Sequence, residues 1–158
     1  MSAASDDVRV RFARPDDHVA AMRVLDGSLL DTDAGTVRER IERAAVLVAT
    51  VGLAGSPDDA TARVVGVLVL DTPEREGIAP RPEEVRPDTR HVEAIAVTRR
   101  RREGGIGRAL VEAAVERVDC DRLTAEFRAE VAPFYESLGF DVDPLTDGRR
   151  RGVLRVGR

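Results

Sequence analysis

Hydrophobic residues alternate with arginines along residues 8–14, and this period of two predicts a half-buried β-strand. Pro15 and the two aspartates that follow it suit the start of a helix, after which apolar residues recur at helical spacing. Residues 36–45 predict a second, more polar helix. Two apolar, valine-rich runs come next, at 45–51 and 63–70. Because the segment between these runs is rich in Gly, Pro and Asp, we expect them to form a β-hairpin.

The second half of the chain predicts a strand, a helix and another strand in succession. Residues 91–97 have a strand pattern, residues 105–118 place apolar side chains on one helical face, and residues 122–128 return to a strand pattern. A strand–helix–strand crossover of this kind is expected to be parallel and right-handed. Residues 132–139 then predict a short helix that ends at a glycine, and the tail, 140–156, predicts a closing hairpin.

These elements together predict a single α/β domain, α+β by layer, that spans residues 1–158. We expect a mixed, mostly antiparallel central sheet of about six or seven strands, with one parallel strand–helix–strand crossover and about four flanking helices. Residues 71–90 contain four prolines and ten charged residues without apolar periodicity, which predicts an extended loop. A loop of this length indicates either a functional flap or a fault in the assignment of the neighbouring elements.

The composition excludes several classes of protein. Apolar residues make up 42% of the chain and charged residues 34%, with a formal net charge of -4, which is typical of a soluble globular protein. The longest apolar stretch, 44–54, is shorter than the ~20 residues of a membrane-spanning helix, and the N-terminus lacks the pattern of a secretory signal. We therefore expect a cytoplasmic protein with no membrane partner. With one cysteine and two histidines, we expect neither an internal disulfide nor a metal site.

All 25 basic side chains are arginine, because the chain contains no lysine. The absence of lysine excludes a lysine nucleophile, a Schiff base and a P-loop, whose motif requires that residue. Asparagine, glutamine and tryptophan are also missing from the sequence. Backbone N–H groups, carboxylates and one phenol remain available for chemistry.

Residues 97–114 carry the most informative pattern: a strand ends, a glycine-rich turn follows, and a helix begins at the glycines. A helix N-terminus has unpaired N–H groups and roughly half a positive charge, and glycine lets a bound anion approach the backbone. Arg99–Arg102 and Arg108 add positive charge, so the segment suits a pyrophosphate. Such arginine runs also occur in solvated loops and in nucleic-acid sites. Because the chain has few aromatic residues and a negative net charge, we expect no nucleic-acid partner.

Two motifs follow each other in this half of the chain, separated by one predicted strand. The first is Arg102-x-x-Gly105-x-Gly107, between an apolar strand and an amphipathic helix, and the second is FYESLGF at residues 134–140. In sequence, order and spacing they resemble the acetyl-CoA-binding motif and the second signature of the GNAT superfamily of N-acetyltransferases. The order of the other elements fits as well, so the resemblance covers nearly the whole chain. The N-terminal half matches the family in its pattern of elements rather than in its residues.

The resemblance implies acetyl-CoA as a co-substrate, no metal, and a set of residues that hold the cofactor. Ile95, Ala96 and Val97 would lie along the pantetheine arm and bond it through backbone groups, with a backbone N–H near Ile95 polarising the thioester carbonyl. The pyrophosphate would be held by the glycine-rich turn and the start of the helix, that is by Arg102, Glu103, Gly104, Gly105, Ile106, Gly107 and Arg108.

The resemblance also implies two catalytic residues. Tyr135 matches a tyrosine that protonates the departing thiolate, and a phenol, with a pKa of about 10, is close enough to a thiol in acidity for that role. Glu93, expected on the same strand face as Ile95, matches an acidic residue that takes the proton from the amine. Both also have structural explanations: Tyr135 as a ring packed on the sheet, and Glu93 as a solvent-facing group or the ion-pair partner of an arginine. His91, expected on the face of Glu93, is an alternative base.

The sequence departs from the family pattern at three positions. Arg101 stands where an aromatic residue is common, Gly104 where a basic residue is common, and Arg128 where an asparagine is usual. The first two departures leave the helix N-terminus and its N–H groups in place. Arg128 either contacts the cofactor as a cation or is a surface residue. Cys120 lies at the far end of the helix from the glycine turn, so we expect no acyl-cysteine intermediate.

These features predict an acetyl transfer from acetyl-CoA to a primary amine of a small molecule, peptide or protein, by direct attack in a ternary complex. The alternative is a non-catalytic acyl-CoA-binding or regulatory module of the same fold. A third hypothesis, RNA binding through Arg99–Arg102, predicts an affinity that depends steeply on salt. No motif identifies the acceptor, and both a monomer and a homodimer remain open.

Overall fold

The computed structural model describes residues 8–26, 33–52, 63–71, 89–101, 104–118 and 120–156. Within these ranges the chain forms one seven-stranded sheet in the order β1-β2-β3-β4-β5-β7-β6. The strands are β1 (Val8–Phe12), β2 (Val46–Val51), β3 (Arg63–Leu70), β4 (Thr89–Val97), β5 (Arg122–Arg128), β6 (Asp141–Pro144) and β7 (Arg149–Arg155). The helices are η1 (Pro15–Asp17), α1 (His18–Asp26), α2 (Ala34–Glu42), η3 (Arg99–Arg101), α3 (Ile106–Arg117), η4 (Ala129–Val131), α4 (Ala132–Ser137) and η5 (Thr146–Gly148).

The sheet is mixed, as expected. Its neighbouring strands are antiparallel except β4 and β5, which are parallel and are connected through α3. The expected hairpins β2–β3 and β6–β7 are both confirmed. The second hairpin returns so that β7 lies between β5 and β6. β4 begins at Thr89, so the predicted loop 71–90 ends inside this strand, and residues 72–88 lie outside the described residues.

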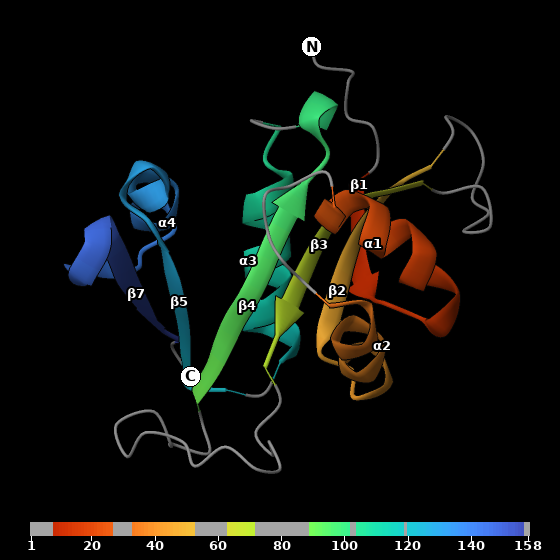
Figure 1. Ribbon diagram of the computed structural model, residues 1–158, viewed down its shortest axis with the longest axis horizontal. Helices are drawn as coiled ribbons and strands as arrows, with labels where there is room; N and C mark the ends of the chain where they lie inside the picture. The colour runs from red at the N-terminus through yellow and green to blue at the C-terminus, as the bar shows by residue number, and fades with distance from the viewer. Residues whose placement is uncertain are drawn as a thin grey trace.

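Helices cover both faces of the sheet and divide the core in two. On one face, α1 and α2 pack over β2, β3 and β4; on the other, α3 packs over β1 to β4, and α4 packs over β6 and β7. In Figure 1, α3 passes behind β3 and β4, while α1 and α2 lie in front. We call these the α1/α2 face and the α3/α4 face. β2 and almost all of β3 are buried on both sides, which explains their continuous apolar runs.

Local signals in the sequence place the ends of the helices. The Asp33 carboxylate accepts the Thr36 N–H at 2.9 Å and so caps the start of α2. Gly139 follows the C-cap residue of α4 and adopts φ +96°, as expected for the glycine that terminates a helix. No helix in the described part of the chain is long and apolar enough to cross a membrane.

Candidate active site

The two parallel strands in the middle of the sheet pair only along their first halves. β4 and β5 are in register from Thr89 and Arg122 to Val92 and Ala125, and their pairing ends there. Figure 1 shows the two strands diverging from their shared end, with β5 running toward α4. On its other edge, β4 stays paired with β3 as far as Val97. We call the diverging part the fork; it presents one edge of β4 to a ligand instead of to a neighbouring strand.

A β-bulge in β4 lies where the fork begins. Val69 of β3 pairs with Ala94, while the next residue, Leu70, pairs with Val92, so Glu93 is an extra residue in β4. In a regular strand Val92 and Ala94 would share one face. Here Val92 belongs to the core of the α3/α4 face and Ala94 to the core of the α1/α2 face. The bulge thus reverses the faces of all later side chains in β4.

The bulge also redirects the peptide groups of β4. The His91 carbonyl accepts a hydrogen bond of 2.9 Å from the residue that follows β3, and the Thr98 N–H donates one of 2.9 Å to a β3 carbonyl. Peptide groups alternate between the two edges of a strand. Because the Thr98 N–H faces β3, the peptide groups of Ile95 and Val97 face β5, within the fork. Ala96 differs: by the same alternation its peptide groups face β3, and its side chain is buried in the α1/α2-face core. The structure therefore separates Ala96 from the other two residues expected along the pantetheine arm.

The glycine-rich turn leads into the N-terminus of α3, as the sequence predicts. Gly105 caps the helix with φ +82°, a left-handed conformation that favours glycine, and the first turn contains no acidic residue. Gly104 and Gly105 are both exposed. The capping residue offers no side chain to the first N–H groups of α3, so these groups suit an external anion. Arg102 and Glu103, expected at the pyrophosphate, lie outside the described residues.

The first turn of α3 is packed tightly against β3 and α4. Ile106 is buried, and a Cβ added to Gly66 of β3 would come within 2.8 Å of its Cγ2 atom. A Cβ added to Gly107 would come within 3.1 Å of the Phe134 ring. Arg108 is exposed and donates from Nη2 to a carbonyl oxygen at the end of α4 at 3.1 Å. Two residues assigned to the pyrophosphate, Ile106 and Gly107, therefore have packing contacts that the motif did not indicate.

Tyr135 of α4 lies at the centre of an aromatic cluster. Its ring stacks on Phe127 of β5 with centroids 4.0 Å apart, and it meets Phe134 and Phe140 edge-on at 5.0 and 5.2 Å. The side chain is 3% exposed, and burial raises the pKa of the phenol to about 12. The packing explanation for Tyr135 is thus confirmed, while its role toward a thiolate stays a prediction. The hydroxyl remains protonated at neutral pH.

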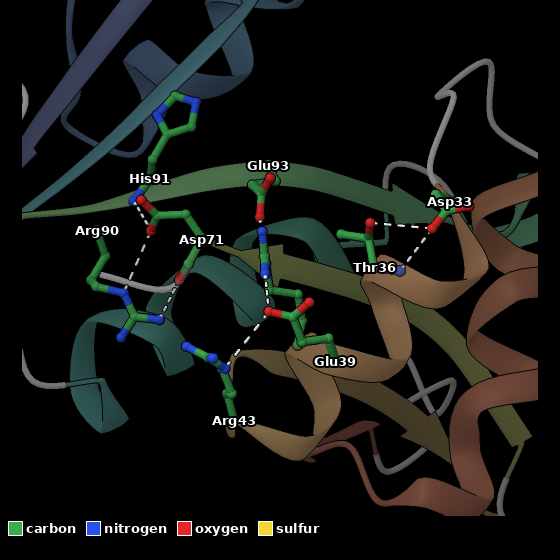
Figure 2. Close-up of polar contacts among 9 residues, drawn as sticks. Asp33, Thr36, Glu39, Arg43, Asp71, Arg90, His91 and Glu93 are labelled. Atoms are coloured by element: carbon green, nitrogen blue, oxygen red, sulfur yellow. Dashed lines mark hydrogen bonds and ion pairs between the residues drawn. The ribbon is translucent and has the colours of Figure 1, made fainter. Parts of the chain in front are cut away.

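Glu93 faces helix α2. Its Oε1 accepts a hydrogen bond from Nε of Arg40 at 2.7 Å, and Figure 2 shows its carboxylate beside that helix. The expectation that Glu93 shares a strand face with Ile95 is wrong, because Ile95 packs against the α3/α4-face core. The bulge at Glu93 is the reason, since it interrupts the alternation on which the expectation rested. The ion pair with an arginine, which the sequence left open, is confirmed.

His91 lies at the closed end of the fork. Its Nδ1 is 2.7 Å from Oγ1 of Thr124 in β5, and its backbone N–H donates to Oδ1 of Asp71 at 2.9 Å. Nη2 of Arg90 donates to the Asp71 carbonyl at 2.6 Å, which ties the start of β4 to the end of β3. Thr124 faces away from the α3/α4-face core, to which its two neighbours in β5 belong. His91 and Glu93 therefore share the α1/α2 face, as expected.

Two further residues singled out by the sequence lie away from the N-terminus of α3. Arg128 is exposed at the end of β5, opposite Arg149 of β7, and its side chain points to the face opposite that of Phe127. This placement separates Arg128 from Tyr135. Cys120 is buried at the far end of α3 and offers no exposed thiol.

Arg40, the partner of Glu93, is a residue that the sequence motifs do not single out. It lies between Val37 and Ile41 on the buried side of α2 and is itself 3% exposed. The available signal was its position: an arginine at helical spacing with two apolar residues is expected to need a buried acidic partner. That partner, Glu93, is 53 residues away in the sequence.

The two faces of the fork offer different chemistry. The α3/α4 face carries the N-terminus of α3, which has no side-chain cap, and the Tyr135 phenol. The α1/α2 face carries the Glu93 carboxylate and the His91 imidazole. The Ile95 peptide group lies on the edge of β4 between them. This arrangement suits a phosphate-bearing ligand on one face and a cationic or nucleophilic amine on the other.

Comparisons with known proteins find one matching family model and several solved structures of similar fold. The family model described as the acetyltransferase (GNAT) domain matches residues 42–142. Among solved structures, Ard1 from Thermoplasma volcanium is 19% identical with a TM-score of 0.70, over 96% of this chain and 99% of that chain. The ribosomal-protein-S18-alanine N-acetyltransferase from Escherichia coli is 19% identical with a TM-score of 0.68, over 96% and 95%.

A third structure contains a bound coenzyme. N-acetylglutamate synthase from Neisseria gonorrhoeae, complexed with coenzyme A and N-acetyl-glutamate, is 18% identical with a TM-score of 0.65, over 96% of this chain and 35% of that chain. A search of curated proteins finds no significant match. At these identities the structural likeness concerns the fold, and the match to the family model covers most of the chain.

Proposed function

Because this chain belongs to the GNAT family of acetyltransferases, we propose that it transfers the acetyl group of acetyl-CoA to a primary amine by direct attack in a ternary complex. The observation that carries the proposal is the fork, which lies between the N-terminus of α3 on one face and the Glu93 carboxylate on the other. Two substrates that approach from opposite faces meet without a covalent enzyme intermediate. The buried position of Cys120 agrees with this route.

The residues around the fork fit acetyl-CoA. In the proposal, the first N–H groups of α3 hold the pyrophosphate, assisted by the segment from Arg102 to Arg108. The peptide groups of Ile95 and Val97 bond the pantetheine arm as a neighbouring strand would. The thioester supplies the activated acetyl group, and the Ile95 N–H donates to its carbonyl oxygen. Ala96 is left out of this set, because its peptide groups face β3 and not the fork.

Glu93 is the proposed general base. A protonated amine has no lone pair, so a carboxylate must first take its proton. The nitrogen then attacks the acetyl carbon, and the bond between that carbon and sulfur breaks as the amide forms. The second proton that the nitrogen loses in this step passes to solvent. His91, two residues away on the same face of β4, is the second candidate for the base. A proton taken by either group stays on the amine side of the fork, away from Tyr135.

Tyr135 is the proposed partner of the departing sulfur. The sequence suggested that the phenol gives up its proton, but burial raises its pKa to about 12. Against a thiol with a pKa of about 8.5, full proton transfer from this phenol would be uphill by about 5 kcal/mol. We therefore propose that the Tyr135 hydroxyl donates a hydrogen bond to the thiolate and keeps its proton. The thiolate then exchanges protons with solvent.

The acceptor remains either a small amine or a peptide or protein amine. The Escherichia coli relative is named for an alanine of a ribosomal protein, and the Neisseria relative binds an acetylated amino acid. The α1/α2 face next to the fork presents the Glu93 carboxylate, whose oxygens can accept hydrogen bonds from an ammonium acceptor.

The test combines acetyl-CoA with a panel of free amino acids, polyamines and peptides with free N-termini, and detects the acetylated product by mass spectrometry. We expect turnover with one class, a lower kcat for Glu93→Gln, and thermal stabilisation by CoA in both proteins. Stabilisation by CoA without any product would favour the non-catalytic acyl-CoA-binding module. Stabilisation by RNA in place of CoA, lost steeply with salt, would favour RNA binding.

A further inference from the structure

Arg40 is a charged residue in an apolar position. It lies in α2 between Val37 and Ile41, which both belong to the α1/α2-face core, and only 3% of its surface is exposed. A buried guanidinium is strongly unfavourable unless acidic groups compensate it. The position of Arg40 therefore requires a partner in the sheet below the helix.

The Arg40 guanidinium lies between two carboxylates. Its Nε is 2.7 Å from Oε1 of Glu93, and its Nη1 is 3.3 Å from Oε1 of Glu39. Glu39 in turn lies 3.7 Å from Nε of Arg43 on the surface of α2. Figure 2 shows these contacts running from β4 along the helix. The contact with Glu93 is the shortest of the three and the most shielded from water, since Glu39 is half exposed.

The bulge and the ion pair act on the same side chain. As the extra residue of β4, Glu93 is turned toward α2 at the point where the fork begins. A glutamate side chain has several rotatable bonds and samples many positions for its carboxylate when it is unrestrained. Arg40 is held by its apolar neighbours, so its hydrogen bond restricts Glu93 to few of these positions.

We propose that Arg40 is a positioning residue for acetyl transfer: its ion pair from α2 holds the Glu93 carboxylate at the point where the fork begins, where the acceptor amine arrives. The inference rests on the proposed function and adds a residue to it. Arg40 is too buried to touch an acceptor, and it acts through Glu93. Catalytic groups work best when neighbouring residues lock their geometry before the substrate binds.

The kinetic test uses Arg40→Met, Arg40→Lys, Glu93→Gln and the double variant Arg40→Met with Glu93→Gln. Arg40→Met is expected to lower kcat about tenfold and to leave the KM for acetyl-CoA unchanged, because only the amine side is disturbed. Arg40→Lys should restore part of the loss. The double variant should be no slower than Glu93→Gln alone, since positioning has no effect once the carboxylate is gone. Arg38→Met, an exposed change on the same helix, is the matched control.

Folding is checked separately, because removal of one member of a buried ion pair strongly destabilises a protein. Thermal unfolding of each variant identifies this effect. The double variant has no unpaired buried charge and is expected to stay folded. If Arg40→Met retains the wild-type kcat, or if its loss multiplies in full with that of Glu93→Gln, the positioning role is wrong.

A spectroscopic measurement tests the ion pair without an acceptor. Glutamate labelled with ¹³C at the side-chain carboxyl gives one resonance for Glu93, which is identified by its loss in Glu93→Gln. We expect this resonance to move in Arg40→Met and to return toward the wild-type position in Arg40→Lys. If the wild type is active but the Glu93 resonance has the same position in Arg40→Met, the role of Arg40 is overturned and the proposed function is not. A wild type that binds CoA but acetylates no amine would overturn the proposed function as well.

Discussion

The ring of Tyr135 stacks on that of Phe127 with centroids 4.0 Å apart and planes inclined by 10°. This contact joins α4 to β5 beyond the point at which β5 has left β4. It fixes the phenol at the fork and at the same time buries it. The packing that positions the hydroxyl is thus also the cause of its raised pKa.

The first prediction concerns the titration of Tyr135. The chain has one tyrosine and no tryptophan, so the near-ultraviolet absorbance of phenolate reports this residue alone. We expect a midpoint near the raised pKa of about 12 in the folded protein, and a midpoint near the ordinary value after unfolding in urea. A folded-state midpoint equal to that in urea would show that the ring is accessible to water and that the aromatic cluster is loose.

The same shift predicts a loss of stability in alkali. The pKa of Tyr135 is raised on folding, so its contribution is complete below the unfolded pKa of about 10 and disappears as pH rises through the folded value. The loss amounts to about 2–3 kcal/mol between these limits. Tyr135→Phe keeps the ring and cannot ionise, so its free energy of unfolding should fall less steeply with pH. Urea unfolding at several alkaline pH values measures the difference, and parallel slopes for the two proteins would contradict the prediction.

Tyr135→Phe also separates packing from catalysis. The ring contacts with Phe127 and Phe140 stay in place, so stability at neutral pH and thermal stabilisation by CoA should match the wild type. Loss of the hydroxyl should lower kcat about a hundredfold, the lower range for a positioned proton or hydrogen-bond donor. Steady-state kinetics with the acceptor found in the panel measures this. An unchanged kcat would leave Tyr135 with a packing role only.

Much of this fold is predictable because its signals are local. The alternation in residues 8–14 and the apolar runs of β2 and β3 are local patterns, and the structure places strands there, although β1 ends at Phe12. The glycine turn before α3 and the glycine after α4 are also local signals, and both glycines have positive φ. Such patterns depend on the backbone of a few neighbouring residues, so a single sequence contains them in full.

The bulge at Glu93 and the partner of Arg40 were not predictable in this way. A bulge is a property of two strands, and the residues that follow Glu93 are small or apolar enough to suit either face. An arginine in a polar helix is ordinarily exposed, and the carboxylate that compensates Arg40 lies 53 residues further along. Both features arise from pairing between distant segments, and together they decide which way the proposed base points.

Asp17 gives a prediction for acid stability. Burial alone would raise the pKa of its carboxyl, but the hydrogen bonds from Arg11 at 2.6 Å and from the Arg14 N–H at 2.7 Å, with the two positive charges, lower it below the usual value. The ionised form therefore stabilises the fold above the unfolded pKa, and this contribution is lost as pH falls through the folded one. Asp17→Asn should cost about 1–3 kcal/mol at neutral pH.

The difference in the free energy of unfolding between Asp17→Asn and the wild type should be smaller in strong acid, where the wild-type carboxyl is protonated and uncharged. Urea unfolding at neutral and strongly acidic pH measures it. Asp16→Asn, an exposed neighbour in the same turn, serves as the control and should change little at either pH. An equal loss from both substitutions would point to the helix start in general rather than to the Arg11 contact.

The last prediction separates the two glycines of the motif. Gly105 has φ +82° and nothing within 4 Å of an added Cβ, so Gly105→Ala should cost about 1–2 kcal/mol through backbone strain alone. At Gly107 the added Cβ would come within 3.1 Å of the Phe134 ring, so Gly107→Ala should cost about 1–3 kcal/mol through overpacking. Phe134→Leu removes the ring edge and should relieve the second loss but leave the first unchanged. Urea unfolding of the three single and two double variants tests this. Because Phe134 also meets Tyr135 edge-on at 5.0 Å, Gly107→Ala should lower kcat as well, through the position of the phenol. If Phe134→Leu rescued both glycine variants or neither, the division of the motif into a backbone glycine and a packing glycine would be wrong.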